Sequence, residues 1–291
     1  MIANCQIIDG KSIAESKKQE LSVFFNAHKA SLLTIWIGSS KVTESFVNIK
    51  KSFARDMGVE FEILKKDKAN KDELVSIIKK TNANHDAVIV QLPMEGIDKR
   101  DEGEILSHIG ILKDVDVLSA SAYEIFKNTK ANELKNIAVP PVARAVWTII
   151  KQYNIDLSNL NITILGKGKL VGRPVFDLLA KFEYSSLRSF DKNDKKEYII
   201  NALAHSDLIV SGIGNPNFIK KEYIKRGAIL IDAGTSTQNN QLFGDISLEC
   251  VDKASLFAKT PGGIGPLTVA SIFENLKILV EKANCKKNMM L

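Results

Sequence analysis

Short apolar runs alternate with amphipathic stretches along almost the whole chain, and this alternation constrains the fold more than any other feature of the sequence. Continuous apolar runs predict strands that are buried in a parallel sheet, and apolar residues spaced three or four apart predict the helices that cover it. In the first half of the chain, strands are predicted at 32–37, 59–64 and 87–91, and helices at 44–57 and 71–81. The pattern therefore predicts an α/β fold with a parallel sheet.

Pro140 and Pro141 interrupt this pattern and predict a boundary between two domains, which suits a chain of 291 residues. We expect two α/β domains, the second a Rossmann-like parallel sheet, and a C-terminal helix that returns to the first domain. The expected domains are 1–139 with 268–291, and 140–267. In the second domain, strands are predicted at 161–165, 185–190, 207–212 and 228–232, and helices at 142–153, 174–182 and 195–205.

Composition narrows the classes of partner. The 40 basic and 34 acidic side chains give a net charge of +6, but lysine pairs such as Lys79-Lys80 have no interleaved aromatic residues. They predict solvated helix faces, and no nucleic acid is expected as a partner. No apolar run has the length of a membrane span, so no membrane partner is expected. Cys5, Cys250 and Cys285 are scattered, which predicts neither disulfides nor a metal site and favours a reducing cytoplasm.

A glycine-rich turn lies between the strand predicted at 161–165 and the next helix. Its glycines are spaced G-x-G-x-x-x-G, one residue longer than the usual dinucleotide fingerprint. Glycines in this context allow a tight turn and let a phosphate approach the backbone at the helix N-terminus. The turn predicts a dinucleotide site, with a plain strand-to-helix turn as the alternative. Its candidate cofactor-binding residues are Gly166, Lys167, Gly168, Val171, Gly172 and Arg173.

Polar turns after two later strands extend this candidate site, because ligands of open parallel sheets bind at the carboxyl ends of the strands. The additional cofactor-binding candidates are Gly212, Gly214, Asp232, Gly234 and Thr235. The choice of dinucleotide stays open. Asp191 would bond a free ribose 2′-hydroxyl and favour NAD, or would cap the following helix, whereas Lys167 and Arg188 would hold the 2′-phosphate of NADP.

Residues 261–268 read Pro-Gly-Gly-Ile-Gly-Pro-Leu-Thr. Three glycines and two prolines in six residues do not suit the interior of a helix or strand, so we predict a rigid loop and a helix that begins at Thr268. Such a loop has open steric space before a helix N-terminus and suits an anionic or electron-rich ligand. A purely structural turn is the alternative. The candidate ligand contacts are Pro261, Gly262, Gly263, Pro266 and Thr268.

In the first domain, polar side chains occur where predicted strands and helices meet. Phe46 and Lys50 are four residues apart and share one helix face. Gln91 ends a buried strand, and Asp116 closes the segment Lys113-Asp-Val-Asp. The structural alternatives are a packed phenylalanine beside a solvated lysine, and a charged turn.

In this order and combination, these segments resemble the methylenetetrahydrofolate dehydrogenase/cyclohydrolase family. The likeness runs nearly end to end, and it also covers Ile7-Ile-Asp-Gly-Lys11 and Tyr153-Asn-Ile-Asp156. The resemblance implies oxidation of 5,10-methylenetetrahydrofolate with NADP or NAD, and hydrolysis of the methenyl product to 10-formyltetrahydrofolate. It further implies tetrahydrofolate derivatives as partners, a homodimer, and a place in one-carbon metabolism and purine biosynthesis.

The resemblance also implies roles for individual residues. Lys50 matches the family's catalytic lysine, Gln91 matches the partner that fixes this lysine, and Asp116 matches the carboxylate that holds the pterin. Phe46 stands where the family usually has a tyrosine that stacks on folate, and the loop 261–268 supplies substrate contacts. Two roles for Lys50 stay open. A neutral base near pH 7 requires a pKa roughly 3 units below the usual value of about 10.4, whereas a charged lysine would orient water.

Several residues depart from the family pattern. Phe46 lacks a hydroxyl, Val142 and Ala143 stand in a stretch where the family has a threonine, Val117 replaces a glycine, and Gly168 replaces a serine. These departures keep two further hypotheses open, namely a dehydrogenase without hydrolase activity and a non-catalytic homologue that binds folate or nucleotide.

Overall fold

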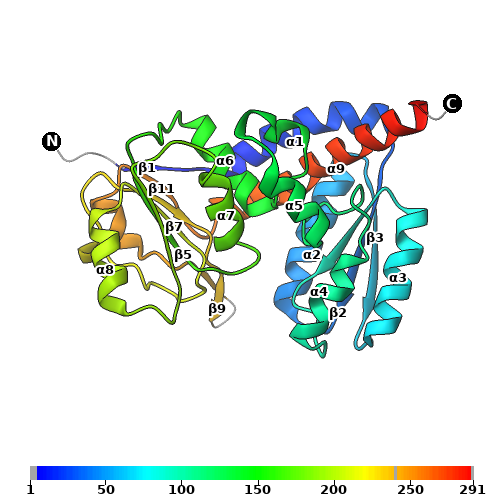
Figure 1. Cartoon of the computed structure of the whole chain (residues 1–291), viewed down its shortest axis with the longest axis horizontal. Helices are drawn as coiled ribbons and strands as arrows, with labels where there is room; N and C mark the ends of the chain where they lie inside the picture. Colours follow the sequence, from blue (N-terminus) through cyan, green and yellow to red (C-terminus); the bar gives the residue numbers. More distant parts are fainter. Residues whose placement is uncertain (1–4, 239–240, 290–291) are drawn as a thin grey trace. The chain divides into compact units, whose positions relative to one another are not determined.

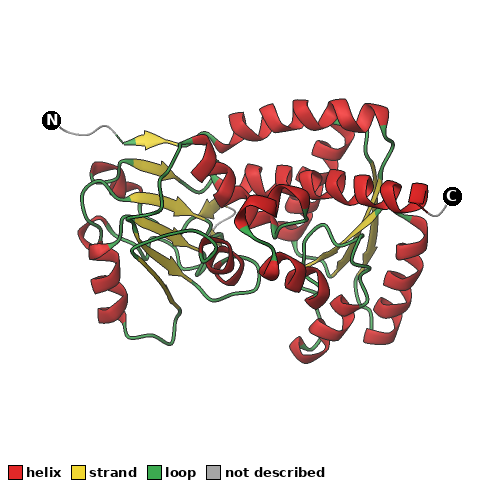
Figure 2. Cartoon of the chain, turned by 45° about the horizontal axis from the view of Figure 1, so that its top comes forward, coloured by secondary structure: helices red, strands yellow, loops and turns green. Residues whose placement is uncertain are grey.

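The computed structural model describes residues 5–238 and 241–289, and it divides into two compact units. One comprises the chain up to Ala14 and Val142–Thr268, here called the 142–268 unit. The other comprises Glu15–Pro141 and the chain from Val269 onward, here called the 15–141 unit. Each unit contains its own parallel sheet with helices packed on it (Figures 1 and 2). The predicted fold class, two α/β domains and a C-terminal helix, is confirmed.

The 15–141 unit contains a three-stranded parallel sheet with the strand order β3-β2-β4. Its strands are β2 (Ser31–Ile37), β3 (Glu60–Lys66) and β4 (Ala87–Gln91). Its helices are α1 (Gly10–Ala27), α2 (Lys41–Asp56), α3 (Lys71–Asn84), α4 (Lys99–Ser107), α5 (Ala120–Asn128), the 3-10 helix Ala131–Asn136 and α9 (Ile264–Met289), of which α1 and α9 extend into the other unit.

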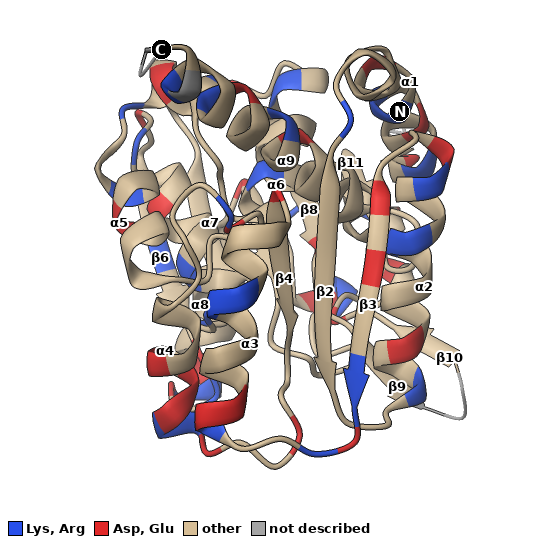
Figure 3. Ribbon diagram, turned by 90° about the vertical axis from the view of Figure 1, so that its right-hand side faces the viewer, with Lys and Arg blue, Asp and Glu red and all other residues tan. Residues whose placement is uncertain are grey.

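Alternate residues of these strands pack on opposite faces of the sheet. Leu33 and Ile35 belong to the apolar cluster formed with α3 and α4, whereas Leu32 and Ile89 belong to the cluster formed with α1, α2 and α9. Figure 3 shows α2 on one side of the sheet and α3 and α4 on the other. The edge strand β3 carries charged side chains, which discourage pairing with a further strand.

The 142–268 unit contains a six-stranded parallel sheet in the order β1-β11-β8-β7-β5-β6, and a separate antiparallel hairpin. The sheet strands are β1 (Gln6–Ile7), β5 (Asn161–Leu165), β6 (Ser186–Phe190), β7 (Leu208–Ser211), β8 (Ile229–Asp232) and β11 (Leu256–Ala258). The hairpin strands are β9 (Ser236–Gln238) and β10 (Gln241–Phe243). The helices are α6 (Pro141–Gln152), α7 (Gly172–Leu179), α8 (Lys196–His205) and the 3-10 helices Lys221–Tyr223 and Leu248–Asp252.

The N-terminal strand is a feature that the sequence pattern does not predict. Gln6 and Ile7 pair in parallel with Leu256 and Phe257 of β11, so this strand adds to the six-stranded sheet. With only two residues, it is too short to show a periodic pattern.

Helix α9 begins at Ile264, earlier than the predicted start at Thr268. Gly265 and Pro266 therefore lie in its first turn, and the expectation that they belong to a loop is wrong. Proline is tolerated there because the first N–H groups of a helix have no intrahelical acceptor. The Thr268 hydroxyl donates to the carbonyl oxygen of Ile264 at 3.0 Å, as expected one turn inside a helix.

No helix in the described part of the chain is long and apolar enough to cross a membrane.

Candidate active site

Helix α2 places Lys50 at the edge of its buried face. The helix begins after Ser40, whose hydroxyl accepts from the backbone N–H of Thr43 at 3.4 Å. Its buried residues are Thr43, Val47 and Ala54. In helical projection Lys50 lies beside this buried stripe, so the residue is half-buried and its charged end is carried toward the sheet.

Gln91, the last residue of β4, receives the Lys50 ammonium. Lys50 Nζ donates to Gln91 Oε1 at 2.8 Å. Gln91 Nε2 donates to the carbonyl oxygen of Leu92 at 3.0 Å, which fixes the end of the amide that faces the lysine. The structure thus brings together two residues that the sequence singles out separately.

Asp114 organises the loop that carries Asp116. Its carboxylate is buried and accepts from the backbone N–H groups of Leu118 at 3.1 Å and Ser119 at 2.7 Å. Ser119 is in turn the N-cap of α5. Burial raises the pKa of Asp114, and these hydrogen bonds act in the opposite direction. The loop is therefore tied to the start of α5 immediately after Asp116.

Lys50 and Asp116 are coupled by charge. Burial lowers the pKa of Lys50 from its ordinary value, and the charge of Asp116 raises it again in part. Burial raises the pKa of Asp116 to about 6, while the charge of Lys50 lowers it and that of Asp114 raises it further. Lys50, Gln91 and Asp116 therefore form one group in the 15–141 unit, which we call the Lys–Gln–Asp group.

Val117, one of the departures from the family pattern, has a backbone φ of 55°. This left-handed conformation favours glycine and is strained for a β-branched residue. The Val117 side chain is nonetheless buried. The loop after Asp116 therefore keeps a glycine-like path although the residue is valine.

Phe46 lies one turn before Lys50 on the same face of α2 and is half-buried. A hollow of about 760 Å³ lies on a different side of this helix, where Lys51, Ser52 and Arg55 line it. It contains none of the predicted site residues, so the predicted chemistry and this hollow are on different helix faces.

In the 142–268 unit, the glycine turn packs too closely for side chains. A Cβ on Gly172 would overlap the carbonyl oxygen of Gly166, and a Cβ on Gly212 would overlap the side chain of Val171. Gly166 also has a φ of 105°. A Cβ on Gly168, in contrast, would meet nothing within 4 Å. The turn therefore holds the start of α7 against two strand ends and leaves open space at Gly168, which fits a dinucleotide phosphate.

Acidic side chains already pair with the basic residues of this turn. Lys167 Nζ lies 3.0 Å from Asp194 Oδ2 and 3.9 Å from Asp191 Oδ2. Arg173 lies 4.0 Å from Asp177, one turn further along α7. The structure thus places Lys167 and Asp191, two residues on which the choice of dinucleotide was predicted to depend, beside each other.

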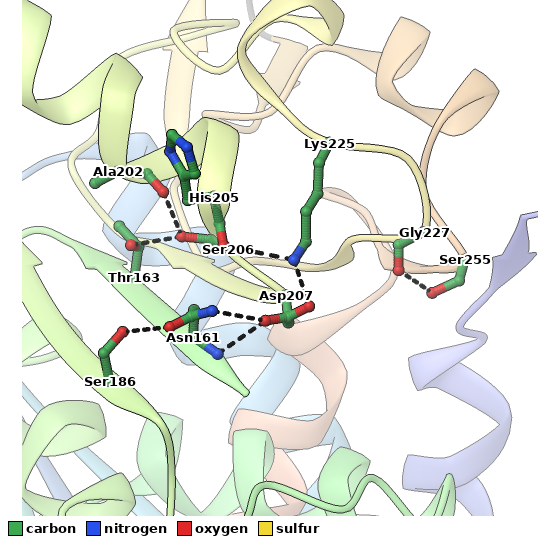
Figure 4. Close-up of polar contacts among 10 residues, drawn as sticks. All are labelled: Asn161, Thr163, Ser186, Ala202, His205, Ser206, Asp207, Lys225, Gly227 and Ser255. Atoms are coloured by element: carbon green, nitrogen blue, oxygen red, sulfur yellow. Dashed lines mark hydrogen bonds and ion pairs between the residues drawn. The ribbon is translucent and has the colours of Figure 1, made fainter. Parts of the chain in front are cut away.

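Arg188 lies apart from Lys167, at a hollow of about 360 Å³ near the amino ends of β5 and β6. The hollow is also lined by Asn161, Ser186 and His205. Figure 4 shows the polar contacts here, in which Ser186 donates to Asn161 and Asn161 donates to Asp207. Arg188 is the middle residue of β6, and its predicted role as a 2′-phosphate ligand stays a prediction.

Asp232 and Asp245 are both fully buried and tie the later loops together. Asp232 accepts from the backbone N–H groups of Gly234 at 3.0 Å, Asp245 at 3.1 Å and Ile246 at 3.0 Å. Burial raises the pKa of Asp232 to about 7, although these hydrogen bonds lower it. Asp232 has no exposed surface, and its hydrogen bonds tie these loops together. Its predicted contact with the cofactor stays a prediction.

Asp245 makes the matching contacts on the other side of these loops. It accepts from the Ser211 hydroxyl and from the backbone N–H groups of Ile213 and Asn215, each at 2.8 Å. A Cβ on Gly234 would overlap its carboxylate. The sequence pattern does not single out Asp245, because a buried carboxylate that binds backbone N–H groups has no motif of its own.

Two further predicted cofactor contacts lie in the same loops. Gly214 has a φ of 67°, a backbone conformation that favours glycine, and its carbonyl oxygen accepts from the Ser236 hydroxyl at 2.9 Å. Thr235 is exposed, so its side chain is accessible to a ligand.

The loop before α9 packs against the start of α1. A Cβ on Gly10 would overlap the carbonyl oxygen of Gly263, so two of the segments that carry the family resemblance meet here. The Thr260 hydroxyl donates to the carbonyl oxygen of Asp232 at 2.9 Å, and the peptide bond from Thr260 to Pro261 is cis. Gly262 has a φ of 103° and open space around its Cα. The loop has open space at Gly262, as a ligand contact requires.

Together these features define a two-domain α/β enzyme with a dinucleotide-type turn in one unit and a coupled lysine, glutamine and aspartate in the other. Residues 8–116 match the model of the tetrahydrofolate dehydrogenase/cyclohydrolase catalytic domain, and residues 140–284 match that of its NAD(P)-binding domain. The chain belongs to the tetrahydrofolate dehydrogenase/cyclohydrolase family.

One relative agrees with this assignment, and two solved structures share the fold. The bifunctional protein FolD of Clostridium novyi is 32% identical over 281 residues, which cover 92% of this chain and 97% of that protein. The crystal structure of FolD from Campylobacter jejuni has a TM-score of 0.87 at 24% identity and covers 96% of this chain and 99% of that one. The Trypanosoma brucei FolD structure, complexed with NADP and an inhibitor, has a TM-score of 0.86 at 23% identity, covering 96% and 98%.

Proposed function

We propose that this protein oxidises 5,10-methylenetetrahydrofolate with NADP or NAD and hydrolyses the methenyl product to 10-formyltetrahydrofolate. The observation that carries the proposal is the 2.8 Å hydrogen bond from Lys50 Nζ to Gln91 Oε1, beside the charge-coupled Asp116. All three residues lie within the segment that matches the family's catalytic domain.

Asp116 binds the pterin in this proposal. Adjacent N–H donors of a pterin make a two-point contact with a carboxylate, and such charge-assisted bonds are the stronger kind. The carboxylate form is required, and with a pKa of about 6 it predominates at neutral pH. Phe46 supplies an aromatic surface one helical turn from Lys50, on which the substrate stacks.

Lys50 acts on the oxygen that enters during hydrolysis. Its ammonium donates to an uncharged acceptor, Gln91 Oε1, and burial outweighs the opposing charge of Asp116, so the pKa of Lys50 is lowered. A lysine with a lowered pKa takes up the proton that water loses when its oxygen bonds to the methenyl carbon. Opening of the ring then breaks the bond from this carbon to N5 and leaves the formyl group on N10.

The glycine turn holds the dinucleotide in this proposal. Gly166 and Gly172 allow the tight turn, and the open space at Gly168 lets the phosphates approach the backbone. Lys167, which pairs with Asp194, is the proposed partner of the 2′-phosphate. The bound NADP accepts the hydride that the substrate methylene loses. The residues of the turn bind and orient it, because hydride transfer depends mainly on alignment.

The loop 261–268 contributes substrate contacts, with Pro261, Gly262, Gly263, Pro266 and Thr268 as the proposed residues. Its support is the open space around Gly262 and the packing of Gly263 against Gly10. The homodimer, the cytoplasmic location and the role in purine biosynthesis are parts of the same proposal and rest on the resemblance. Light scattering of the purified chain at micromolar concentration tests the homodimer.

A dehydrogenase without hydrolase activity is the second candidate, and the absence of a hydroxyl on Phe46 favours it. A Phe46→Tyr variant separates the two. If this variant gains hydrolysis that the wild type lacks, the second candidate is correct. If the wild type already hydrolyses the methenyl compound, the bifunctional proposal holds.

A spectrophotometric assay tests the proposal. The purified chain is given methylenetetrahydrofolate with NADP or NAD, and methenyltetrahydrofolate alone, and is compared with Lys50→Met and Lys51→Met. Lys51 is the matched control because it lines the hollow on a different face of α2. We expect Lys50→Met to abolish hydrolysis and Lys51→Met to leave it unchanged. Absence of turnover with either dinucleotide would overturn the proposal and favour a non-catalytic homologue.

A further inference from the structure

Two buried polar atoms of strand β2 have no hydrogen-bond partner in the described protein. They are the hydroxyl oxygen of Thr34 and the indole Nε1 of Trp36. Thr34 is 0% exposed and Trp36 is 3% exposed. A buried donor without an acceptor costs about 1–3 kcal/mol, so two such groups on one strand require a physical explanation.

Strand register places both groups on the face of the sheet that carries the Lys–Gln–Asp group. Trp36 pairs with Gln91 across the parallel ladder, and Thr34 pairs with Ile89. Paired residues of neighbouring strands point to the same face at a spacing of about 4.8 Å. Ile89 packs with α1, α2 and α9, which identifies this face. Trp36 is therefore the direct neighbour of the glutamine that receives Lys50.

The Trp36 ring is held in place from its other side. Lys65, its partner on β3, has its ammonium 4.0 Å from the centre of the indole ring. An ammonium has no acceptor to offer, and an indole N–H only donates. The acceptor for this N–H must therefore come from another molecule.

The chemistry of the neighbouring groups selects water as that molecule. Phe46 offers no polar atom, whereas Lys50 Nζ uses one of its hydrogen-bonding positions on Gln91. A buried water typically makes about three hydrogen bonds to polar groups that are otherwise unsatisfied. The indole N–H and the Thr34 hydroxyl lie two residues apart on one face of β2 and offer two such groups. Lys50, which is bonded to the neighbouring Gln91, is the candidate for the third.

We propose that Trp36 and Thr34 hold an ordered water beside Lys50, and that this water is the one consumed in hydrolysis. This inference rests on the proposed function. The water oxygen forms the bond to the methenyl carbon, and one of its protons passes to Lys50. The bond from that carbon to N5 then breaks as Lys50 returns this proton to N5, and the remaining hydroxyl proton is released to solvent as the formyl carbonyl forms. The Trp36 indole N–H donates to the water, the Thr34 hydroxyl donates to it or accepts from it, and the two bonds fix its position for attack.

Hydride transfer needs no water, and this difference provides the test. Trp36→Phe keeps an aromatic ring but removes the N–H, and Thr34→Val keeps the shape but removes the hydroxyl. The matched control is Trp147→Phe, because Trp147 lies in the other unit and also has a lysine, Lys151, 3.9 Å from its ring centre. We expect each β2 variant to slow hydrolysis about tenfold, as loss of one hydrogen bond implies, while dehydrogenase turnover stays within about twofold of wild type.

Two outcomes would overturn the inference. Equal loss of both activities in Trp36→Phe would indicate a packing role. A higher urea midpoint for Thr34→Val and Trp36→Phe, with both activities retained, would show that the two groups are unsatisfied in the native protein. If the wild type lacks hydrolysis but retains dehydrogenase turnover, the proposed function is wrong. The urea midpoints of Thr34→Val and Trp36→Phe then test the water by themselves, and a midpoint above that of the wild type would contradict it.

A measurement without turnover addresses the same water. The chain has two tryptophans, so ¹⁵N-labelled Trp147→Phe protein has a single indole N–H resonance, that of Trp36. We expect a cross-relaxation peak between this proton and a long-lived water, and its loss in Thr34→Val. An indole N–H with no contact to water would contradict the inference.

Discussion

The side-chain amide of Asn275 on α9 donates to the carbonyl oxygen of Val115 at 2.7 Å, one residue before Asp116. The same Nδ2 donates to the carbonyl oxygen of Val139 at 2.7 Å, and Oδ1 accepts from the backbone N–H of Val139 at 3.1 Å. Asn275 is fully buried. A residue near the end of the chain therefore fixes the loop that presents the proposed pterin carboxylate.

Replacement of Asn275 by leucine should strongly destabilise the 15–141 unit. The variant keeps the side-chain volume but leaves three buried backbone groups without a partner, each at a cost of about 1–3 kcal/mol. We expect the free energy of unfolding in urea to fall by about 3 kcal/mol or more. Asn284→Leu, at an exposed site on the same helix, is the control and should change it by about 0.5 kcal/mol or less. Equal effects of the two variants would refute the role of Asn275.

The pH dependence of substrate binding should report the titration of Asp116. Its pKa is raised to about 6, so the carboxylate that binds the pterin is complete above this value and is lost as the pH falls through it. We expect kcat/KM for methylenetetrahydrofolate to fall about tenfold per pH unit below pH 6. Asp116→Asn should have low activity and no inflection near this pH. The control Glu124→Gln, at an exposed site, should retain both the activity and the inflection. A wild-type profile that is flat across the pKa of Asp116 would contradict this assignment.

The main elements of the fold were predictable because their residues carry periodic patterns. β4 was predicted at 87–91 and β5 at 161–165, and both have these bounds in the structure. The start of α9 could not be predicted correctly, because the sequence does not distinguish a proline in a first helical turn from a proline in a loop. The two-residue strand β1 depends on its partner β11, and pairing between segments so distant in the chain leaves no local signal.

In the candidate site, too, only the residues that lie in recognisable sequence segments were predictable. Lys50 and Gln91 were recognisable from their family segments, and their direct hydrogen bond follows from the placement of α2 beside β4. Trp36 and Asn275 carry no motif, because their roles arise from burial without a partner in one case and from backbone contacts in the other. Arg188 was a plausible phosphate ligand by charge alone, and the strand register places it in the middle of β6, opposite Thr163 of β5.

Val117 should tolerate replacement by glycine better than its neighbour Val115. Both side chains are buried, but only Val117 has a left-handed backbone, with a φ of 55°. Truncation to glycine removes apolar contacts at both positions, and at Val117 it also relieves about 1–2 kcal/mol of backbone strain. In urea unfolding, we expect Val117→Gly to cost at least about 1 kcal/mol less than Val115→Gly. The reverse order would show that the loop is not strained.

The ion pair of Lys167 with Asp194 should set the preference for NADP over NAD. The two charged atoms lie 3.0 Å apart. The backbone N–H of Asp191, together with Lys167, lowers the pKa of Asp194, so this carboxylate is charged at neutral pH. Asp194 therefore competes with the 2′-phosphate of NADP for the same ammonium.

Asp194→Asn removes the nearer of two competing charges and leaves Lys167 with only Asp191, at 3.9 Å, as an acidic neighbour. We expect the ratio of kcat/KM for NADP over NAD to rise about two- to fivefold, the value of an exposed ion pair, and Lys167→Met to lower the same ratio. Asp252→Asn, which removes the partner of Lys221 at the surface of the same unit, is the control and should leave the ratio unchanged. A ratio that responds to neither Asp194→Asn nor Lys167→Met would place the selection of the 2′-phosphate elsewhere in the unit.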